Sequence, residues 1–444
     1  MIGSTPPPAG SSPPAGSSPP DELAHWTSKL QELRHLTLVA VPVGVLAGVG
    51  VSALEAVCNH LLWGHFVTVT PGLRLLFPVV GLVLSGLILR ILNVRSVGML
   101  NEVVVHYHAT PDKLSVRDDA LKATACVATV GFGASAGLGG PSQWLGARIG
   151  QYLVRLGRTR FRSLHDLTDQ HALLIGAASG VSAIFRAPLT GTLLALETPF
   201  SKDIDATALL PASIGALIAH FVHGLLLDNA PLLPFPTEAA VDGSALLASA
   251  AIGIVAGVTS RGFQRVMIWT RRTSTRLSWW ASALLGGLVT SATALVAFKF
   301  FGDTWTLQAG LPMSHAVFAA QFVGAAALSL LALKLVSVWA TFGTSGVAGL
   351  LVVTLTVGSL IGATLAPVFP ELSPPQACAI AVCAYLAANY NAPMTGVALA
   401  AEWGGTGLLK DAWVAVLIAA WIGEGLANTP AKRGTRHMGT IHHH

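Results

Sequence analysis

Long apolar runs, broken by glycine and proline rather than by charged residues, dominate the pattern of this chain. They lie near 37–57, 74–92, 120–138, 171–199, 206–227, 244–268, 279–300, 316–340, 346–369, 376–401 and 411–428. Many have the roughly 20 residues that a helix needs to cross a bilayer. Because some runs exceed one span and contain internal Gly or Pro, we expect more helices than runs, several of them short.

A transmembrane β-barrel is the other closed structure that lipid permits, and the pattern excludes it. A barrel would show alternating segments of about ten residues, whereas these runs are continuously apolar. Composition agrees with helices, since 52% of the residues are hydrophobic and 11% are charged, against about 25% charged in a typical soluble domain. The sequence therefore predicts an all-α, polytopic membrane protein.

Two membrane halves and two tails account for the chain. Residues 1–35 are a Pro/Gly/Ser-rich tail and lead-in, expected to be disordered. The two membrane repeats are 36–228 and 240–430, and 431–444 is a C-terminal tail that ends like part of a purification tag. Arginines gather in a few loops, as the positive-inside bias produces, so nucleic acid is not an expected partner. Lys29 and Arg34 precede the first span, so both termini are predicted to be cytoplasmic. The protein itself is predicted to lie in the cell membrane.

One motif is written twice, about half a chain apart. RAPLTGTLLALE at 186–197 recurs as NAPMTGVALAAE at 391–402, with Pro, Thr, Gly and Glu in register. This predicts two halves derived from one ancestral unit. Such halves are common in transporter folds, where they are often inverted and broken helices meet near the membrane midplane. Glu197 and Glu402, which end the two copies, are interpreted as helix-end groups that bond exposed N–H groups or face water.

A second correspondence joins two glycine-rich stretches. GLGGPSQWLGARIG at 137–150 and GTSGVAGLLVVTLTVGSLIG at 343–362 each lead into an apolar helix. Pro141 suits the first helical position. A helix that begins there presents unpaired N–H groups and the positive end of its dipole. Two such helix starts directed at one place would bind an anion with backbone groups alone.

These residues resemble the CLC family of chloride channels and chloride/proton antiporters. GLGGP at 137–141 stands in place of the family's G-(K/R)-E-G-P loop, and its APL(A/T)G helix starts are similar to 186–191 and 391–396. Its G-x-F-x-P loop is similar to the stretch from Gly349, and its GSGIP loop aligns weakly with RSVGMLN at 95–101. The resemblance covers roughly 36–430.

The resemblance implies a CLC-like inverted repeat with many tilted, broken helices. It implies a homodimer in membrane lipid, in which each subunit has its own pore. The expected partners are inorganic anions, with bound chloride or another halide and no cofactor. The anion-binding or pore-lining residues that it implies are Ser96, Gly98, Met99, Gly139, Gly140, Gln143, Gly349, Leu350, Leu351 and Val352. The family's central serine falls at Ser96, Val97 or Gly98, a choice that the sequence leaves open.

Departures from the family pattern suggest the mechanism. Gly139 replaces the gating glutamate, and Thr198 replaces the inner glutamate that carries protons in the antiporters. No tyrosine follows the last apolar run, so the family's inner tyrosine is also missing. A charge inside a membrane is costly and is kept where it works, so its absence at both positions argues against the usual proton coupling. We therefore expect a passive, uncoupled chloride channel.

Alternatives from other classes stay open. Proton coupling through displaced groups would use Glu102 or His106. A fluoride-selective relative is another alternative, although that branch generally keeps the gating glutamate. His106 and His108 alternate in the way that two metal ligands on a strand do, but no third ligand is near, and we expect a loop mouth and no metal site. An enzyme is not expected, because HExxH and GxSxG motifs are absent.

Overall fold

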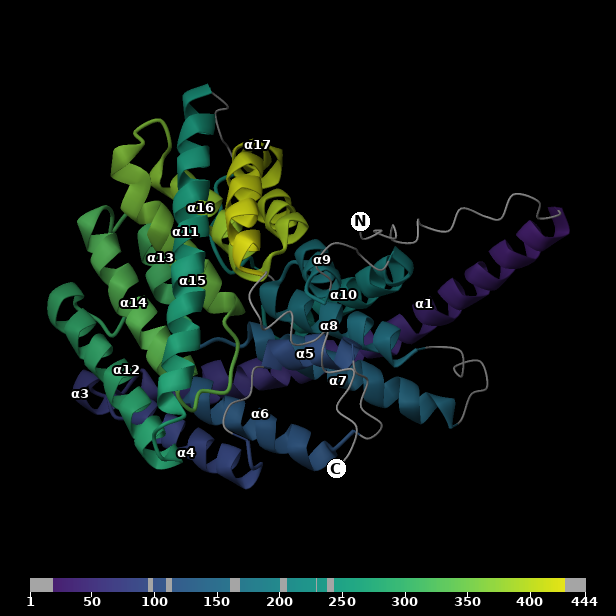
Figure 1. Cartoon of the computed structure of the whole chain (residues 1–444), viewed down its shortest axis with the longest axis horizontal. Coiled ribbons are helices and arrows are strands. Elements are labelled where there is room, and N and C mark those ends of the chain that lie inside the picture. Colours follow the sequence, from purple (N-terminus) through teal and green to yellow (C-terminus); the bar gives the residue numbers. More distant parts are fainter. Residues whose placement is uncertain are drawn as a thin grey trace, which may run out of the picture.

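The computed structural model describes residues 19–94, 99–108, 114–159, 168–199, 206–228, 230–237 and 243–427. The structure in these ranges is helical (Figure 1), with elements α1 (Pro19–Glu55), the π-helix η1 (Ala56–Trp63), α2 (Gly64–Phe66), α3 (Pro71–Arg74), α4 (Phe77–Ile91), α5 (Met99–His108), α6 (Val116–Gly131), α7 (Gly139–Arg158), α8 (Asp169–Phe185), α9 (Pro188–Glu197), α10 (Ala206–Leu226), α11 (Gly243–Ser274), α12 (Trp279–Phe301), α13 (Leu311–Phe318), α14 (Ala325–Gly343), α15 (Leu351–Leu365), the 3₁₀ turn η3 (Ala366–Val368), α16 (Pro374–Tyr390) and α17 (Pro393–Ala427).

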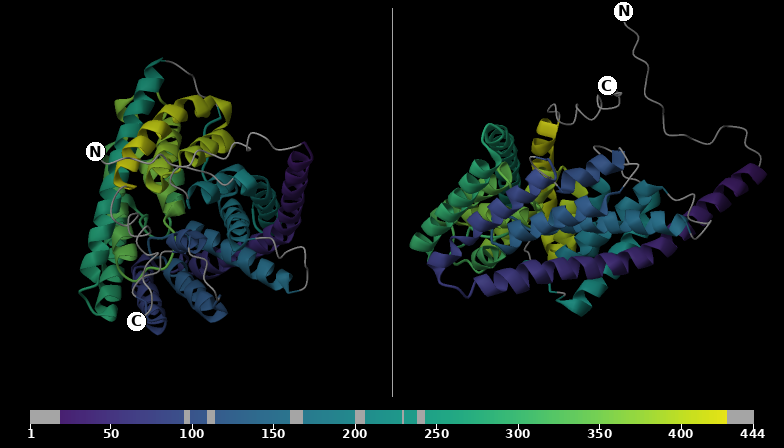
Figure 2. Two further views of the ribbon diagram at one scale, coloured as in Figure 1. Left: turned by 45° about the vertical axis from the view of Figure 1, so that its right-hand side comes forward. Right: turned by 90° about the horizontal axis from the view of Figure 1, so that it is seen from below.

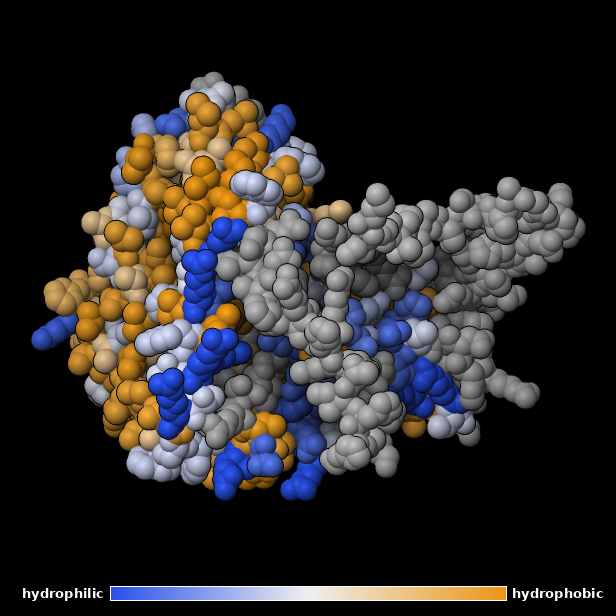
Figure 3. Space-filling model, in the orientation of Figure 1, coloured by the Kyte–Doolittle hydropathy of each residue, from blue (hydrophilic) through white to orange (hydrophobic). Residues whose placement is uncertain are grey.

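Many of these helices suit a membrane. Eight helical stretches in the described part of the chain are long and apolar enough to cross one. Large apolar side chains such as Leu247 and Val258 on α11 and Leu288 on α12 lie exposed on the outer faces of their helices. Figure 3 shows a broad hydrophobic surface over the side of the molecule that holds α11, α12 and α14. Lipid tails can cover such a surface, so the prediction of a multi-pass helical membrane protein is confirmed.

The longest helix lies along one edge of the first half. α1 extends past α7, α8 and α10, as the second view of Figure 2 shows. It begins at Pro19, within the segment 1–35 that the sequence analysis assigns to a tail and lead-in. Its far end passes without interruption into the π-helix η1, which the sequence did not predict.

Two apolar runs are broken at equivalent points. The run 171–199 forms α8 and α9, and the run 376–401 forms α16 and the start of α17. At the breaks, Arg186 (φ 56°) and Asn391 (φ 54°) have left-handed backbones. A proline two residues later, Pro188 or Pro393, begins the next helix, where its missing N–H costs nothing. The run 316–340 is divided as well, between α13 and α14, so the expected short, broken helices are confirmed.

The two copies of the repeated motif cap each other. The Glu197 carboxylate accepts hydrogen bonds from Met394 N (2.9 Å), from Thr395 N (2.7 Å) and from the Thr395 hydroxyl. In the other copy, Glu402 accepts from Leu189 N (3.0 Å), Thr190 N (2.9 Å) and the Thr190 hydroxyl (2.8 Å). The interpretation of both glutamates as groups that bond exposed helix N–H groups is confirmed.

This exchange fixes how the halves are related. Each glutamate lies towards the end of its motif and bonds to the start of the other motif, so the two short segments must lie antiparallel. A two-fold relation between antiparallel segments is the arrangement that an inverted repeat requires. The same symmetry recurs nearby, since α7 packs closely on α8 in the first half and α15 on α16 in the second.

Glycines permit both of those close packings. A Cβ on Gly146 of α7 would lie 2.1 Å from the Gly176 carbonyl oxygen of α8, and one on Gly362 of α15 would lie 2.3 Å from the Ala377 carbonyl oxygen of α16. Side chains cannot be tolerated at such distances, so the helices are in backbone contact. Small residues commonly bring membrane helices together in this way.

We predict that Glu402→Ala destabilises the fold, because three donors at the start of α9 lose their acceptor. The expected loss is roughly 2–4 kcal/mol, since hydrogen bonds to charged groups are stronger than neutral ones. Thermal unfolding of the detergent-purified protein measures it. Glu371→Ala, which removes an exposed acid, is the matched control and should unfold like the wild type. If the wild type, Glu402→Ala and Glu371→Ala unfold at the same midpoint temperature, the Glu402 cap contributes nothing to stability.

Candidate functional site

The two glycine-rich stretches meet in a single backbone bridge. Gly137 N donates to Gly349 O (3.0 Å), and Gly349 N donates to Gly137 O (2.8 Å). Immediately after the bridge α7 begins at Gly139 and α15 begins at Leu351. The first N–H groups of a helix have no acceptor within it, and the helix dipole is positive at that end. The bridge therefore places two helix starts, one from each half, beside each other.

Glycine is required where the two bridged segments come into contact. A Cβ on Gly349 would lie 2.2 Å from Gly140 N, and one on Gly140 would lie 2.9 Å from Gly349 Cα. Any side chain at either position would push the loops apart. The glycine-rich composition of both stretches thus follows from backbone contact between the halves.

Gly139 is confined for a different reason. A Cβ at this residue would lie 2.6 Å from the Cβ of Leu351 and 3.0 Å from one of its terminal methyl carbons. The Leu351 side chain is fully buried. An apolar side chain from the second half therefore fills the space that a side chain at residue 139 would enter.

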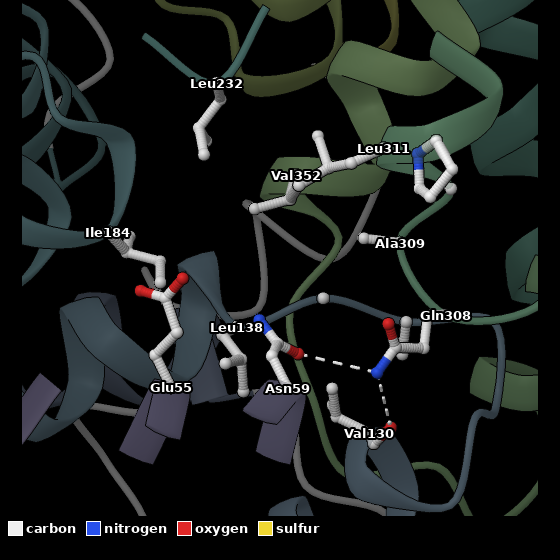
Figure 4. A pocket seen from close by; sticks show the side chains of 14 residues that line it. Glu55, Asn59, Val130, Leu138, Ile184, Leu232, Gln308, Ala309, Leu311 and Val352 are labelled. Atoms are coloured by element: carbon white, nitrogen blue, oxygen red, sulfur yellow. Dashed lines mark hydrogen bonds between the residues drawn. The ribbon is translucent and has the colours of Figure 1, made fainter. Parts of the chain in front are cut away.

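A small cavity of about 50 Å³ adjoins this junction. Figure 4 shows its lining, to which Leu138 and Val352 of the junction, Leu311 at the start of α13 and Glu55 at the end of α1 all contribute. Gly310, which has φ 88°, turns the chain into α13. The full set of lining residues is Glu55, Asn59, Val130, Ala136, Gly137, Leu138, Ile184, Leu232, Gln308, Ala309, Gly310, Leu311, Pro312 and Val352.

The structure brings most of the predicted anion-site residues together. Six of them lie at the junction: Gly139, Gly140, Gly349, Leu350, Leu351 and Val352. Gln143, one turn into α7, is fully buried, and its amide has no hydrogen-bond partner among the described residues. Met99 is buried at the start of α5, whereas Ser96 and Gly98 lie outside the described residues. Their roles in anion binding stay predictions.

The candidate proton carriers lie away from the cavity, on α5. Glu102 forms an ion pair with Lys122 (2.8 Å) and accepts a hydrogen bond from Trp144 Nε1 (3.1 Å). His106 Nδ1 lies 2.6 Å from the carbonyl oxygen of Glu102. His106 and His108 are in the last turn of a helix, so the expectation that they form a loop mouth was wrong. Thr198 follows the end of α9 and donates its hydroxyl to Leu194 O.

Sequence reasoning missed the charged residues nearest the cavity. Glu55 lines it, and Arg186 and His223 contact the Glu55 carboxylate. Lys334 lies behind the cavity wall. A signal for two of them was available, because Glu55 and Lys334 are charges within the apolar runs 37–57 and 316–340. Ionisable residues inside a membrane are expensive and often functional.

Lys334 is a buried cation directed at the loop before α13. Its side chain is fully buried in α14, and its ammonium donates to the carbonyl oxygens of Thr306 (3.0 Å) and Gln308 (2.6 Å). In the described part of the chain it forms no ion pair with a carboxylate. Gln308 lines the cavity and donates to Asn59 Oδ1 (3.4 Å) on its other side. The positive charge therefore lies one layer of residues behind the cavity.

Solved structures share this architecture. A slow cyanobacterial Cl⁻/H⁺ antiporter matches with a TM-score of 0.77 over 91% of this chain and 99% of its own, at 18% identity. A CLC-type fluoride/proton antiporter matches with a TM-score of 0.75 over 89% of this chain and 96% of its own, at 21% identity. At such identities the likeness concerns the fold.

Sequence relatives and a family profile define the family. A putative chloride channel protein, ClcB-like, of Ralstonia nicotianae is 26% identical over 65% of this chain and 67% of its own length. The H⁺/Cl⁻ exchange transporter ClcA of Salmonella paratyphi A is 23% identical over 62% of this chain, and the match spans 59% of that relative's length. The profile described as voltage gated chloride channel matches residues 80–424. The chain therefore belongs to the voltage-gated chloride channel family, as its repeated motif and its paired helix starts lead one to expect.

Proposed function

We propose that this protein is a passive, uncoupled chloride channel, with an anion site formed by backbone N–H groups at the starts of α7 and α15. The observation that carries the proposal is Gly139, which offers no titratable group and whose side-chain space is filled by Leu351. The proposal includes a homodimer with one pathway per subunit and both termini in the cytoplasm. The apolar helices and the family match support an anion pathway across a membrane.

Electrostatics at the junction favour an anion. Two helix starts contribute partial positive charge, and N–H groups at such positions commonly bind anions. Lys334 adds a buried amine that donates to two backbone carbonyl oxygens behind the cavity wall, although the loop residue Leu138 is uncharged where the resembled family has a basic residue. A buried charge requires a partner or a strong hydrogen-bonding environment. An anion in the neighbouring cavity supplies a counter-charge for Lys334.

The acidic groups near the repeated motif support an uncoupled pathway. Glu197 accepts hydrogen bonds from two backbone N–H groups and a hydroxyl at the start of α17, which is a structural role. Thr198, at the position of the family's inner acid, has no carboxyl group to titrate. A proton path through α9 therefore lacks its usual groups.

Proton coupling is the second candidate. The related structures are those of a Cl⁻/H⁺ antiporter and a fluoride/proton antiporter, and one relative is an H⁺/Cl⁻ exchange transporter. Glu102 and His106 would be the displaced carriers in this case, and fluoride would be a further substrate to test. The two candidates differ in whether anion movement does work on protons.

We predict that purified protein in liposomes releases chloride without driving protons uphill. Chloride efflux is followed with an electrode and proton uptake with a trapped pH dye, using chloride, bromide, nitrate and fluoride in turn. A passive pathway reverses at the Nernst potential of the anion, because no second ion contributes. Uphill proton movement driven by a chloride gradient would refute the uncoupled proposal and support the second candidate.

We predict that Lys334→Met weakens anion binding, because it removes a positive charge close to the cavity. The chloride concentration for half-maximal flux should rise on the order of tenfold, a change of ~1.4 kcal/mol, as expected for a charge interaction across a partly polar medium. Lys299→Met, which removes an exposed lysine of α12, is the matched control. If Lys334→Met and Lys299→Met need the same chloride concentration for half-maximal flux, Lys334 has no electrostatic role.

We predict that a carboxylate at residue 139 slows flux only when Leu351 makes room for it. In Gly139→Glu/Leu351→Ala the new acid can occupy the space that Leu351 leaves, and its charge repels anions at neutral pH. Flux should fall relative to Leu351→Ala alone and recover at acidic pH, when the carboxylate is protonated. Identical fluxes for the two variants at every pH would mean that residue 139 does not line the pathway.

A further inference from the structure

A carboxylate lies on the cavity wall opposite the second half of the molecule. Glu55 is the last residue of α1, and both it and Asn59 line the cavity. Figure 4 shows both side chains extending towards the open space. The Glu55 side chain is 8% exposed, so its charge is largely removed from water. A charge in this place must have a structural partner or a function.

The partners of Glu55 come from two other elements. Its Oε2 lies 2.8 Å from Nε2 of His223 in α10, and its Oε1 lies 3.6 Å from Nη2 of Arg186. Arg186 is shared, because its Nη1 contacts Asp228 Oδ2 at 2.9 Å. It also donates to the carbonyl oxygen of Ala230 (2.9 Å). One cation thus serves two carboxylates, which leaves His223 as the group that can balance Glu55 by taking up a proton.

His223 is placed to share a proton with Glu55. Its side chain is fully buried, and its Nδ1 has no hydrogen-bond partner among the described residues. The strongest contact of the imidazole is therefore with the carboxylate. Two titratable groups at 2.8 Å behave as one unit, and a proton added to either atom changes the charge of the pair from −1 to zero.

The surrounding charges do not cancel this change. His220 lies one turn before His223 on α10, and Cys58 and His60 follow Glu55 on η1. Asp228 is 62% exposed on its side chain and is bound by Arg186. Across the cavity, Lys334 is held by backbone carbonyls behind the opposite wall. Of the pair, Glu55 lines the cavity directly, and His223 lies behind it with its Nε2 against the Glu55 carboxylate.

The backbone directly after Glu55 has an unusual helical geometry. Residues Ala56–Trp63, directly after Glu55, form a π-helix. This geometry is rare, usually short, and frequently found at functional sites. Here it extends over the turns that carry Asn59 into the cavity wall.

We propose that the Glu55–His223 pair controls anion entry to this cavity, with one proton from water neutralising it and thereby removing the negative charge from the wall. The inference rests on the proposed function, since it assumes that anions pass this cavity. An anion approaching the deprotonated pair is repelled, and one approaching the protonated pair is not. The proton stays in the pair, so flux depends on pH while the reversal potential follows the anion alone.

The test is chloride efflux from liposomes that contain the full-length protein, measured between pH 5 and pH 8. Wild-type flux should be several-fold faster at pH 5 than at pH 8. Glu55→Gln should be fast at every pH, because its wall is neutral throughout. His223→Gln can still donate to Glu55 but cannot take up a proton, so its flux should rise only at lower pH than that of the wild type. Asp303→Asn, which changes an exposed carboxylate paired with Arg74, is the matched control and should keep the wild-type profile.

The outcomes separate this inference from the proposed function. Wild-type protein that passes no anion at any pH overturns both. Wild-type flux that is independent of pH, or pH dependence that Glu55→Gln retains, overturns the role of the pair and leaves the channel proposal standing. If Glu55→Gln does not fold, His223→Gln decides the question, because an unchanged pH profile in that variant also overturns the inference.

Discussion

The hydrogen-bonded bridge between Gly137 and Gly349 is the contact on which the functional region depends. It joins the two halves at the points where α7 and α15 begin, and backbone contact at this distance excludes side chains from Gly140 and Gly349. Without it the two positive helix ends would separate and the cavity beside them would lose one wall. The close glycine packing of α7 on α8 and of α15 on α16 holds each helix in the position that the bridge requires.

Charged side chains in the described structure find partners in three different ways. Glu197 and Glu402 are satisfied completely by helix N–H groups and hydroxyls, which makes them structural. The Lys334 amine donates to neutral carbonyl oxygens and has no carboxylate partner among the described residues. Glu55 has a partner that can itself titrate. Because desolvation makes every unpaired charge expensive, these differences indicate which groups stabilise the fold and which can act on an anion.

The sequence permitted the fold and part of the site to be predicted. The repeated motif indicated paired halves and assigned helix-end roles to Glu197 and Glu402, because Pro, Thr, Gly and Glu kept the same spacing in both copies. Leu351 filling the space beside Gly139 could not be predicted, since it depends on contact between residues from different halves. The Glu55–His223 contact is equally long-range, and the π-helix after Glu55 has no propensity signature.

The crossed glutamate caps bear on how a two-half protein of this kind could arise. Each half supplies one acceptor and one set of donors, and neither can use its own glutamate on its own helix start. Two separate copies of a single half would form the same pair of contacts by symmetry. A single ancestral glutamate would then have formed both contacts in the dimer. Fusion of two copies of the gene would therefore keep the contacts between the halves without any new residue.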